Sequence, residues 1–116
     1  MPFSEERFKE LVGEALDGLP AWVLESLDNI EVFVEDSPPV DTPTLLGLYR
    51  GVPLSNRGSG YSGVVPDHIT VYREPIERLA RGNEERLRQL VARTVAHEIA
   101  HHFGISDERL RELGSY

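Results

Sequence analysis

Residues 83–107 read NEERLRQLVARTVAHEIAHHFGISD and contain the longest amphipathic segment of the chain. Apolar residues at 87, 90, 91, 95 and 99 recur with helical spacing, which predicts a helix over about Glu84–Phe103. Asn83 can cap the first turn of this helix, and Gly104 suits the left-handed residue that commonly follows a helix C-terminus. We therefore expect one long helix that ends in a sharp turn just before residue 107.

The remaining elements are predicted from helical spacing, from alternation and from capping residues. They are helices over about Glu5–Leu16 and Ala21–Leu27, strands over Ile30–Glu35, Leu45–Tyr49 and His68–Tyr72, an optional strand at Gly63–Val65, a helix between Pro75 and Gly82, and a last helix over about Asp107–Leu113. This order predicts an α+β fold with a small mixed sheet of three to four strands, packed on the long helix. Trp22 is expected in the core.

Length and composition limit the kind of protein. The chain has 116 residues, which fits one domain over 1–116, and it has no cysteine, so any metal must be held by His, Asp or Glu. The N-terminus lacks the basic and apolar regions of a signal peptide, and no apolar run reaches the ~18 residues of a membrane span. We therefore expect a cytoplasmic protein without membrane contact.

The charge distribution argues against nucleic-acid binding. Residues 1–50 hold 11 acids and 3 bases, whereas residues 51–116 hold 9 of each, so the net charge of −8 comes from the first half. A nucleic-acid interface usually needs a positive surface that displaces counterions from phosphate. A zinc hydrolase acting on RNA is thus disfavoured, and we expect no nucleic-acid partner.

The long helix carries a pattern that indicates a zinc site. His97 and His101 are four residues apart, so their imidazoles lie one turn apart on one helix face and can bind one Zn²⁺. Glu98 follows the first histidine, and from there it can reach a water at the metal without being a ligand. The adjacent His102 points away from this face, so we expect it to be structural or exposed.

Asp107 is the expected third ligand. Gly104 stops the helix three residues after His101, and the following turn can bring Asp107 back toward the metal. Asp107 has a competing interpretation, since an acid in the first turn of a helix interacts well with the helix dipole. In that case the third ligand would be Glu108, Glu112 or His68.

Residues 97–107, His-Glu-Ile-Ala-His-His-Phe-Gly-Ile-Ser-Asp, resemble the active-site consensus of metzincin metallopeptidases in the variant whose third ligand is Asp. The whole chain also resembles a family of small bacterial zincin-like proteins, in the segments 46–54, 58–63 and 69–73 and in this motif. The resemblance implies a zincin-like fold, with N-terminal helices and a short C-terminal helix around the sheet and active-site helix. It also implies one Zn²⁺ per chain.

The function implied is a zinc metallopeptidase that hydrolyses peptide bonds of a peptide or protein substrate. A zinc-activated water would attack the scissile carbonyl, with Glu98 as general base. Metzincins carry a methionine turn downstream of the motif and a lower half-domain, whereas residues 1–116 contain only Met1 as methionine, so we expect neither feature here. The alternative is therefore a non-catalytic or partner-dependent zinc-binding domain, in which a protein partner completes the cleft.

Overall fold

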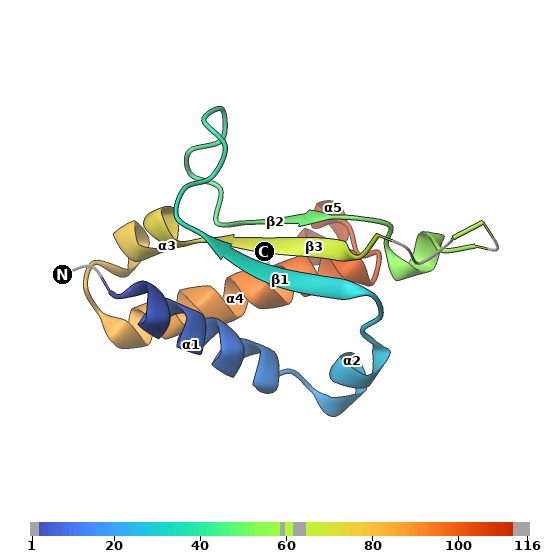
Figure 1. Cartoon of the computed structure of the whole chain (residues 1–116), viewed down its shortest axis with the longest axis horizontal. Helices are drawn as coiled ribbons and strands as arrows, with labels where there is room; N and C mark the ends of the chain where they lie inside the picture. The colour runs from blue at the N-terminus through green and yellow to red at the C-terminus, as the bar shows by residue number, and fades with distance from the viewer. Residues whose placement is uncertain (1–2, 59, 62–64, 113–116) are drawn as a thin grey trace.

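The computed structural model describes residues 3–58, 60–61 and 65–112. Its elements are α1 (Glu5–Asp17), α2 (Ala21–Ser26), β1 (Ile30–Glu35), β2 (Gly47–Arg50), a 3₁₀ turn η1 (Leu54–Asn56), β3 (Asp67–Tyr72), α3 (Arg73–Ala80), α4 (Glu84–His102) and α5 (Asp107–Glu112) (Figure 1). The α+β fold with its small mixed sheet is confirmed. The optional strand at Gly63–Val65 falls largely outside the described residues.

The sheet has three strands within the described part of the chain, in the order β1-β3-β2. β1 runs parallel to β3, with Ile30 opposite Asp67, and β2 runs antiparallel to β3, with Gly47 opposite Val71. β3 is therefore the central strand. Among these three strands, β2 pairs with β3 along one side and leaves its other backbone edge free.

The helices cover one face of the sheet, and the burial of side chains along β3 shows which face this is. Ile69 and Val71 are fully buried beneath the sheet, whereas His68 is exposed on the opposite face. Figure 1 shows α1 and α4 on the same side of the sheet. Among the residues whose burial is described, the core is formed by buried apolar side chains of β3 and of helices α1 to α4: Phe8, Leu11, Val12, Val23, Ile69, Val71, Ile76, Ala80, Leu87, Val91, Val95 and Ile99.

The prediction that Trp22 lies in this core is wrong. Its side chain is 64% exposed, and its ring contacts Phe103 at a centroid distance of 6.1 Å. α2 has only six residues, and Val23 is the one that it buries. No helix within the described ranges is long and apolar enough to cross a membrane.

Both ends of α4 follow the local signals in the sequence. The Asn83 side chain accepts a hydrogen bond of 2.9 Å from the Arg86 N–H, which caps the first turn. Gly104 adopts φ +90°, and a Cβ there would lie 2.0 Å from Ser55 Oγ. A residue with a side chain would therefore be strained and would collide with η1. Gly104 thus ends the helix and lets η1 pack against the turn that follows.

Candidate metal centre

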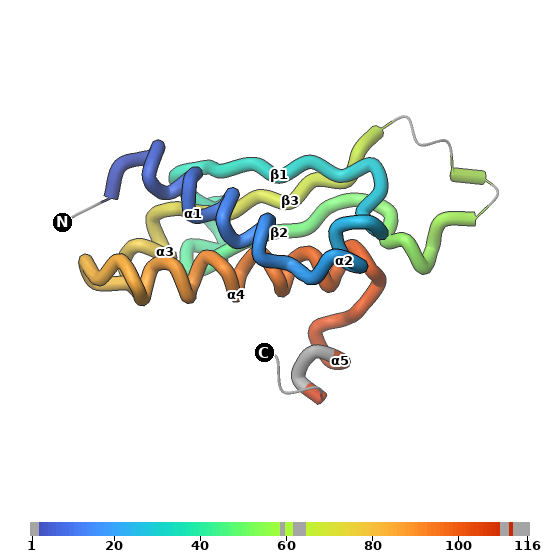
Figure 2. Tube along the Cα trace, turned by 90° about the horizontal axis from the view of Figure 1, so that it is seen from below, coloured from blue at the N-terminus to red at the C-terminus, as the bar shows by residue number. Residues whose placement is uncertain are grey.

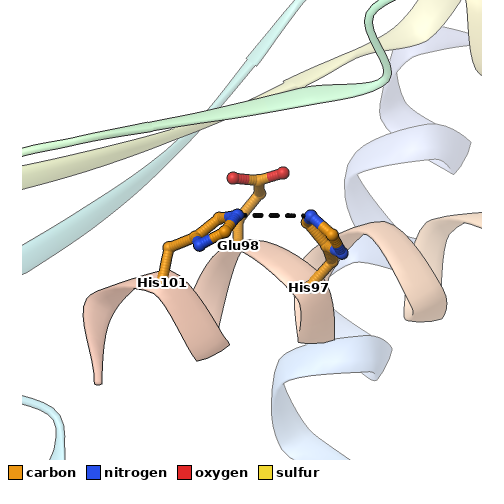
Figure 3. A group of neighbouring side chains, drawn as sticks. All are labelled: His97, Glu98 and His101. Atoms are coloured by element: carbon orange, nitrogen blue, oxygen red, sulfur yellow. Dashed lines mark hydrogen bonds between the residues drawn. The ribbon is translucent and has the colours of Figure 1, made fainter. Parts of the chain in front are cut away.

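Three predicted ligand atoms come together beside the last turns of α4. The Nε2 atoms of His97 and His101 are 3.2 Å apart, as drawn by the dashed line in Figure 3. Asp107 Oδ1 lies 3.1 Å from His97 Nε2 and 3.0 Å from His101 Nε2. The three atoms thus form a nearly equilateral triangle.

Local backbone structure explains how Asp107 returns to the two histidines. After Gly104, the Ile105 N–H donates to the Ala100 carbonyl over 3.0 Å, so the chain folds back on the end of α4. Ser106 Oγ then accepts from the Arg109 N–H at 3.1 Å and caps α5. Asp107 is the first residue of α5. It therefore lies in the first turn of a helix, where an acid interacts well with the helix dipole, and it also contacts both histidines.

A backbone contact orients His101. Its Nδ1 lies 2.8 Å from the carbonyl oxygen of Ile105. A carbonyl can only accept, so Nδ1 carries a proton and donates, and in the neutral imidazole the lone pair is then on Nε2. Metal-binding histidines commonly hold their second ring nitrogen in this way. His101 is thus arranged as an Nε2 ligand.

The triangle fits a single zinc ion. Ligand bonds of about 2.0–2.1 Å at tetrahedral angles separate two ligand atoms by about 3.3 Å. The three observed separations of 3.0, 3.1 and 3.2 Å lie close to this value. Two imidazole nitrogens and one carboxylate oxygen are also a donor set that zinc accepts. These residues can therefore hold a zinc ion with a fourth position left for a small molecule.

Glu98 stands next to this triangle and is buried. Its side chain extends from α4 toward the strands, between the two histidines (Figure 3), and the residue is 7% exposed. The ligand atoms of His97, Glu98 and His101 lie within 4.8 Å of one another. Burial raises the pKa of Glu98 to about 7; the neighbouring His101 opposes this rise and Asp107 adds to it.

Glycine at position 47 allows the sheet to approach Glu98. A Cβ on Gly47 would lie 2.8 Å from Thr94 Cγ2, 3.2 Å from Glu98 Cγ and 3.3 Å from the Thr70 carbonyl oxygen. Any larger residue would push β2 away from α4. The first residue of β2 therefore packs directly over the candidate general base.

Comparison with known proteins agrees with this geometry. A family model described as zincin-like metallopeptidase matches residues 27–115. The chain belongs to this family. The matched range includes all the residues of the candidate metal centre.

The zincin-like chain also resembles a solved structure, titled a conserved hypothetical protein from Thermo thermophilus. The two share 25% sequence identity and a TM-score of 0.59, over 96% of this chain and 97% of that one. No curated protein gives a significant match. The fold of this zincin-like chain is thus shared across nearly its full length with a protein whose title states no activity.

The other candidates for third ligand are placed differently. His68 is exposed on the face of the sheet opposite the helices, with its ring 5.0 Å from that of Phe33. Glu112 pairs with Arg109 at 3.2 Å, and Glu108 is exposed to solvent. Among the carboxylates and histidines of these alternatives, Asp107 is the one that the structure brings into contact with both His97 and His101.

A second polar cluster, which the sequence analysis missed, lies directly behind the metal centre. We call Tyr49, Arg57, Asp67 and His102 the buried cluster. His102 Nδ1 lies 2.9 Å from Asp67 Oδ2, the Tyr49 hydroxyl donates to the same oxygen, and the Val52 N–H donates to Oδ1 at 3.0 Å. We expected His102 to be either structural or exposed. The residue is fully buried, so its role is structural.

The charge of Asp67 is balanced inside the buried cluster. Arg57 Nη2 lies 3.0 Å from Asp67 Oδ2, although it lacks hydrogen-bond geometry there. Burial by itself would raise the pKa of Asp67, but the hydrogen bonds from Tyr49, Val52 and His102 and the Arg57 guanidinium together hold it below its ordinary value. Asp67 is therefore an ionised anchor. In the sequence it looks like an ordinary acid at the start of a strand.

A cleft opens over the candidate metal centre. It has a volume of about 520 Å³ and is lined by β2, by η1 with its preceding Pro53, and by the metal-site residues. A hollow of about 570 Å³ at the opposite end of the sheet is lined by Arg73, Glu74, Glu77 and neighbouring charged residues. That hollow contains no histidine, and Arg73 pairs with Glu77 at 3.2 Å, so the chemistry points to the cleft over α4.

Proposed function

We propose that this chain is a zinc-dependent metallopeptidase in which His97, His101 and Asp107 hold the zinc ion and Glu98 is the general base. The observation that carries the proposal is the triangle of ligand atoms with a buried carboxyl group beside it. Membership of the zincin-like metallopeptidase family supports the same activity. One zinc per chain is expected.

A zinc ion at this position would polarise the scissile carbonyl and activate water for attack. Glu98 has to take a proton from that water and pass it to the leaving amine, so its pKa should be near the working pH. Burial brings the pKa of Glu98 to about 7 in the metal-free protein. The positive charge of a bound ion would lower it again and favour the carboxylate that accepts the proton.

The free edge of β2 supports a peptide or protein as substrate. β3 is central among the described strands, so β1 and β2 each have an unpaired edge, and β2 is the one of the two that lines the cleft. An extended peptide can add to such an edge through backbone hydrogen bonds. Gly47 keeps β2 close to Glu98, so a peptide paired with β2 would have its backbone near the general base.

The test combines metal analysis with cleavage of a diverse peptide library. Glu98→Gln should keep about one zinc per chain while cleavage falls by at least about 100-fold, because the proton acceptor is lost. His97→Ala should lose the zinc. His68→Gln, on the far face of the sheet, is the matched histidine control and should keep both zinc and activity. Zinc-loaded wild-type protein that cleaves no peptide would contradict the proposal.

A second candidate is a non-catalytic or partner-dependent zinc domain. It is favoured by the open side of the site: the Asp107 side chain is 52% exposed, and α5 stands away from the body of the fold (Figure 2). A protein partner bound there would complete the cleft. In this case Glu98→Gln would leave the cellular function intact, whereas the peptidase proposal requires its loss.

A further inference from the structure

Trp22 on α2 lies at the surface, although tryptophan is on average one of the more buried residues. The residue is 64% exposed, and its ring contacts that of the partly buried Phe103 at the end of α4, with a centroid distance of 6.1 Å. Figure 2 shows α2 beside this end of α4. A large part of the indole thus stays in contact with water, and covering it would stabilise a complex by about 25 cal/mol for each Å² of apolar surface.

The face of α2 that carries Trp22 also carries an acid. Glu25 and Ser26 follow Trp22 by three and four residues, so all three lie on one side of the helix. The Ser26 hydroxyl donates to the Trp22 carbonyl oxygen at 2.7 Å within the helix. Glu25 is exposed, and no cation of the described ranges pairs with it. This face therefore combines an exposed ring with an exposed negative charge.

Both segments that supply the two rings lack lysine and arginine. Residues 10–49, which include α2, hold nine acids and no Lys, Arg or His, and residues 94–108, which include the end of α4, hold no Lys or Arg. Some of the nine acids are neutralised from elsewhere, as Asp28 is by Arg57 at 3.0 Å. Asp17, at the end of α1, is exposed and has no such pair among the described residues. The surface therefore presents an apolar ring next to negative charge.

This charge decides between the kinds of partner that an exposed tryptophan can bind. Nucleic acids and anionic lipid surfaces are negative, so the acids would repel them. A second copy related by two-fold symmetry would place the same acidic segment against itself, where like charges also repel. A basic protein segment is attracted instead, and its Lys or Arg side chains can stack on an indole ring. Tryptophan is also among the residues that contribute most to binding at protein interfaces.

We propose that α2, with Trp22 at its centre, is a docking surface for a basic amphipathic segment of another protein. The apolar side of that segment packs on Trp22 and Phe103, and its Lys or Arg side chains pair with Asp17 and Glu25. Phe103 follows His101 by two positions, so a partner docked here lies at the end of α4 that carries the metal-site histidines. The docking surface depends neither on zinc nor on peptide cleavage.

The first experiment uses the fluorescence of Trp22, which is the only tryptophan of the chain. Zinc-loaded Glu98→Gln protein, chosen so that the probe stays intact, is titrated with a helical peptide of about 15 residues that carries Leu on one face and Lys on the other. The emission should shift to shorter wavelength as the ring leaves water. The peptide should bind at least about tenfold more tightly than one with Glu for Lys or Ser for Leu. Equal binding of the three peptides, or no change in emission, would overturn the proposal.

Substitutions in the same background then locate the binding site by calorimetry. Trp22→Ser should weaken binding of the basic peptide by at least about tenfold and Glu25→Lys by about fivefold, because the first removes the ring and the second reverses the neighbouring charge. Val40→Ser, at a residue that is 98% exposed, and Glu6→Lys, on α1, are the matched controls and should change the affinity by less than about twofold. All four residues are exposed, so the fold should be kept. Equal effects of Trp22→Ser and Val40→Ser would overturn the proposal.

Two further outcomes would assign the surface to another partner. Binding to vesicles of anionic phospholipid that is lost in Trp22→Ser would assign it to a membrane. A dimer of the wild type, observed by sedimentation and lost in Trp22→Ser, would assign it to a second copy. Either result would overturn the proposed basic partner. Peptide binding by a protein whose wild type cleaves no peptide would support the docking surface and contradict only the peptidase proposal.

Discussion

His101 and His102 are neighbours in the chain, and each contacts an aspartate, but their surroundings are opposite. His101 Nε2 lies 3.0 Å from Asp107, whose side chain is 52% exposed. His102 Nδ1 lies 2.9 Å from Asp67, and these two side chains are 0% and 2% exposed. One helix end therefore carries an open His–Asp pair and a buried one.

The two pairs differ in the further contacts that their side chains make. Asp107 also contacts His97, so three ligand atoms gather at the edge of a cleft. His102 instead accepts the Asp28 N–H on Nε2 at 3.4 Å, which assigns its proton to Nδ1 and makes it a donor to Asp67. A buried polar group is stable when its neighbours satisfy it, whereas a metal site needs several acceptors held close together. The buried pair is thus structural, and the open pair is suited to bind a cation.

The largest expected effect is a difference in the free energy of unfolding between substitutions of Asp67 and of Asp107. Asp67→Asn should lower the free energy of unfolding by about 3–5 kcal/mol, because three hydrogen-bond donors lose a charged acceptor and the buried Arg57 guanidinium keeps only the exposed Asp28 carboxylate as a partner. Asp107→Asn in metal-free protein should change it by less than about 1 kcal/mol, because that side chain is half exposed. Urea unfolding of both variants in the presence of a chelator measures the difference. Equal destabilisation by the two changes would remove the distinction drawn between the pairs.

The next effect concerns Glu98, which is buried like Asp67, although no described residue donates a hydrogen bond to its side chain as Tyr49, Val52 and His102 do to Asp67. The pKa of Glu98 is raised by burial from 4.5 to about 7. The folded state therefore keeps the proton to a higher pH than the unfolded state does. The stability from this group is fully present below pH 4.5, is lost as the pH rises to about 7, and stays lost above that. The total loss is about 3 kcal/mol.

Glu98→Gln removes this titration, so it should gain stability relative to the wild type between about pH 5 and about pH 8. Urea unfolding of metal-free protein measures the free energy of unfolding of both proteins at each pH. The value for the variant minus that for the wild type should be about 2–3 kcal/mol larger at pH 8 than at pH 5. Asp67 does not interfere, since its lowered pKa places its titration below this pH window. A difference of the same size at both pH values would show that Glu98 is not desolvated.

A third effect tests the open pair through zinc affinity. Asp107→Asn should weaken zinc binding by about 100-fold or more, because loss of a group that only supports a ligand already costs about 10–100-fold. Competition with a chromogenic zinc chelator measures the change. Glu108→Gln, at the next position of α5, is the matched control and should bind zinc like the wild type. Unchanged affinity in Asp107→Asn would exclude Asp107 as the third ligand.

The smallest effect concerns the turn that carries Asp107. Ser106→Ala removes the side chain that caps α5 through the Arg109 N–H. Loss of such a cap costs about 1 kcal/mol, which corresponds to about a fivefold weaker zinc affinity if the cap holds Asp107 in place. The same chelator competition measures it. A zinc affinity equal to that of the wild type would mean that Asp107 is positioned without the help of this cap.

Several features could be predicted from the sequence because they depend on neighbours within one or two turns. The spacing of His97 and His101, the Asn83 cap and the left-handed Gly104 are set by local backbone geometry. The structure has each of these where the pattern indicates it. The order of elements and the α+β class also follow from local periodicity.

Other features were decided only by tertiary structure. The central place of β3, the close approach of Gly47 to Glu98 and the partners of Asp67 all join residues distant in the chain. No spacing rule predicts them, because burial and hydrogen bonding depend on which surfaces meet. His101 and His102 show this most directly: the sequence places both at the end of one helix, and only packing against the sheet assigns one to the cleft and the other to the core.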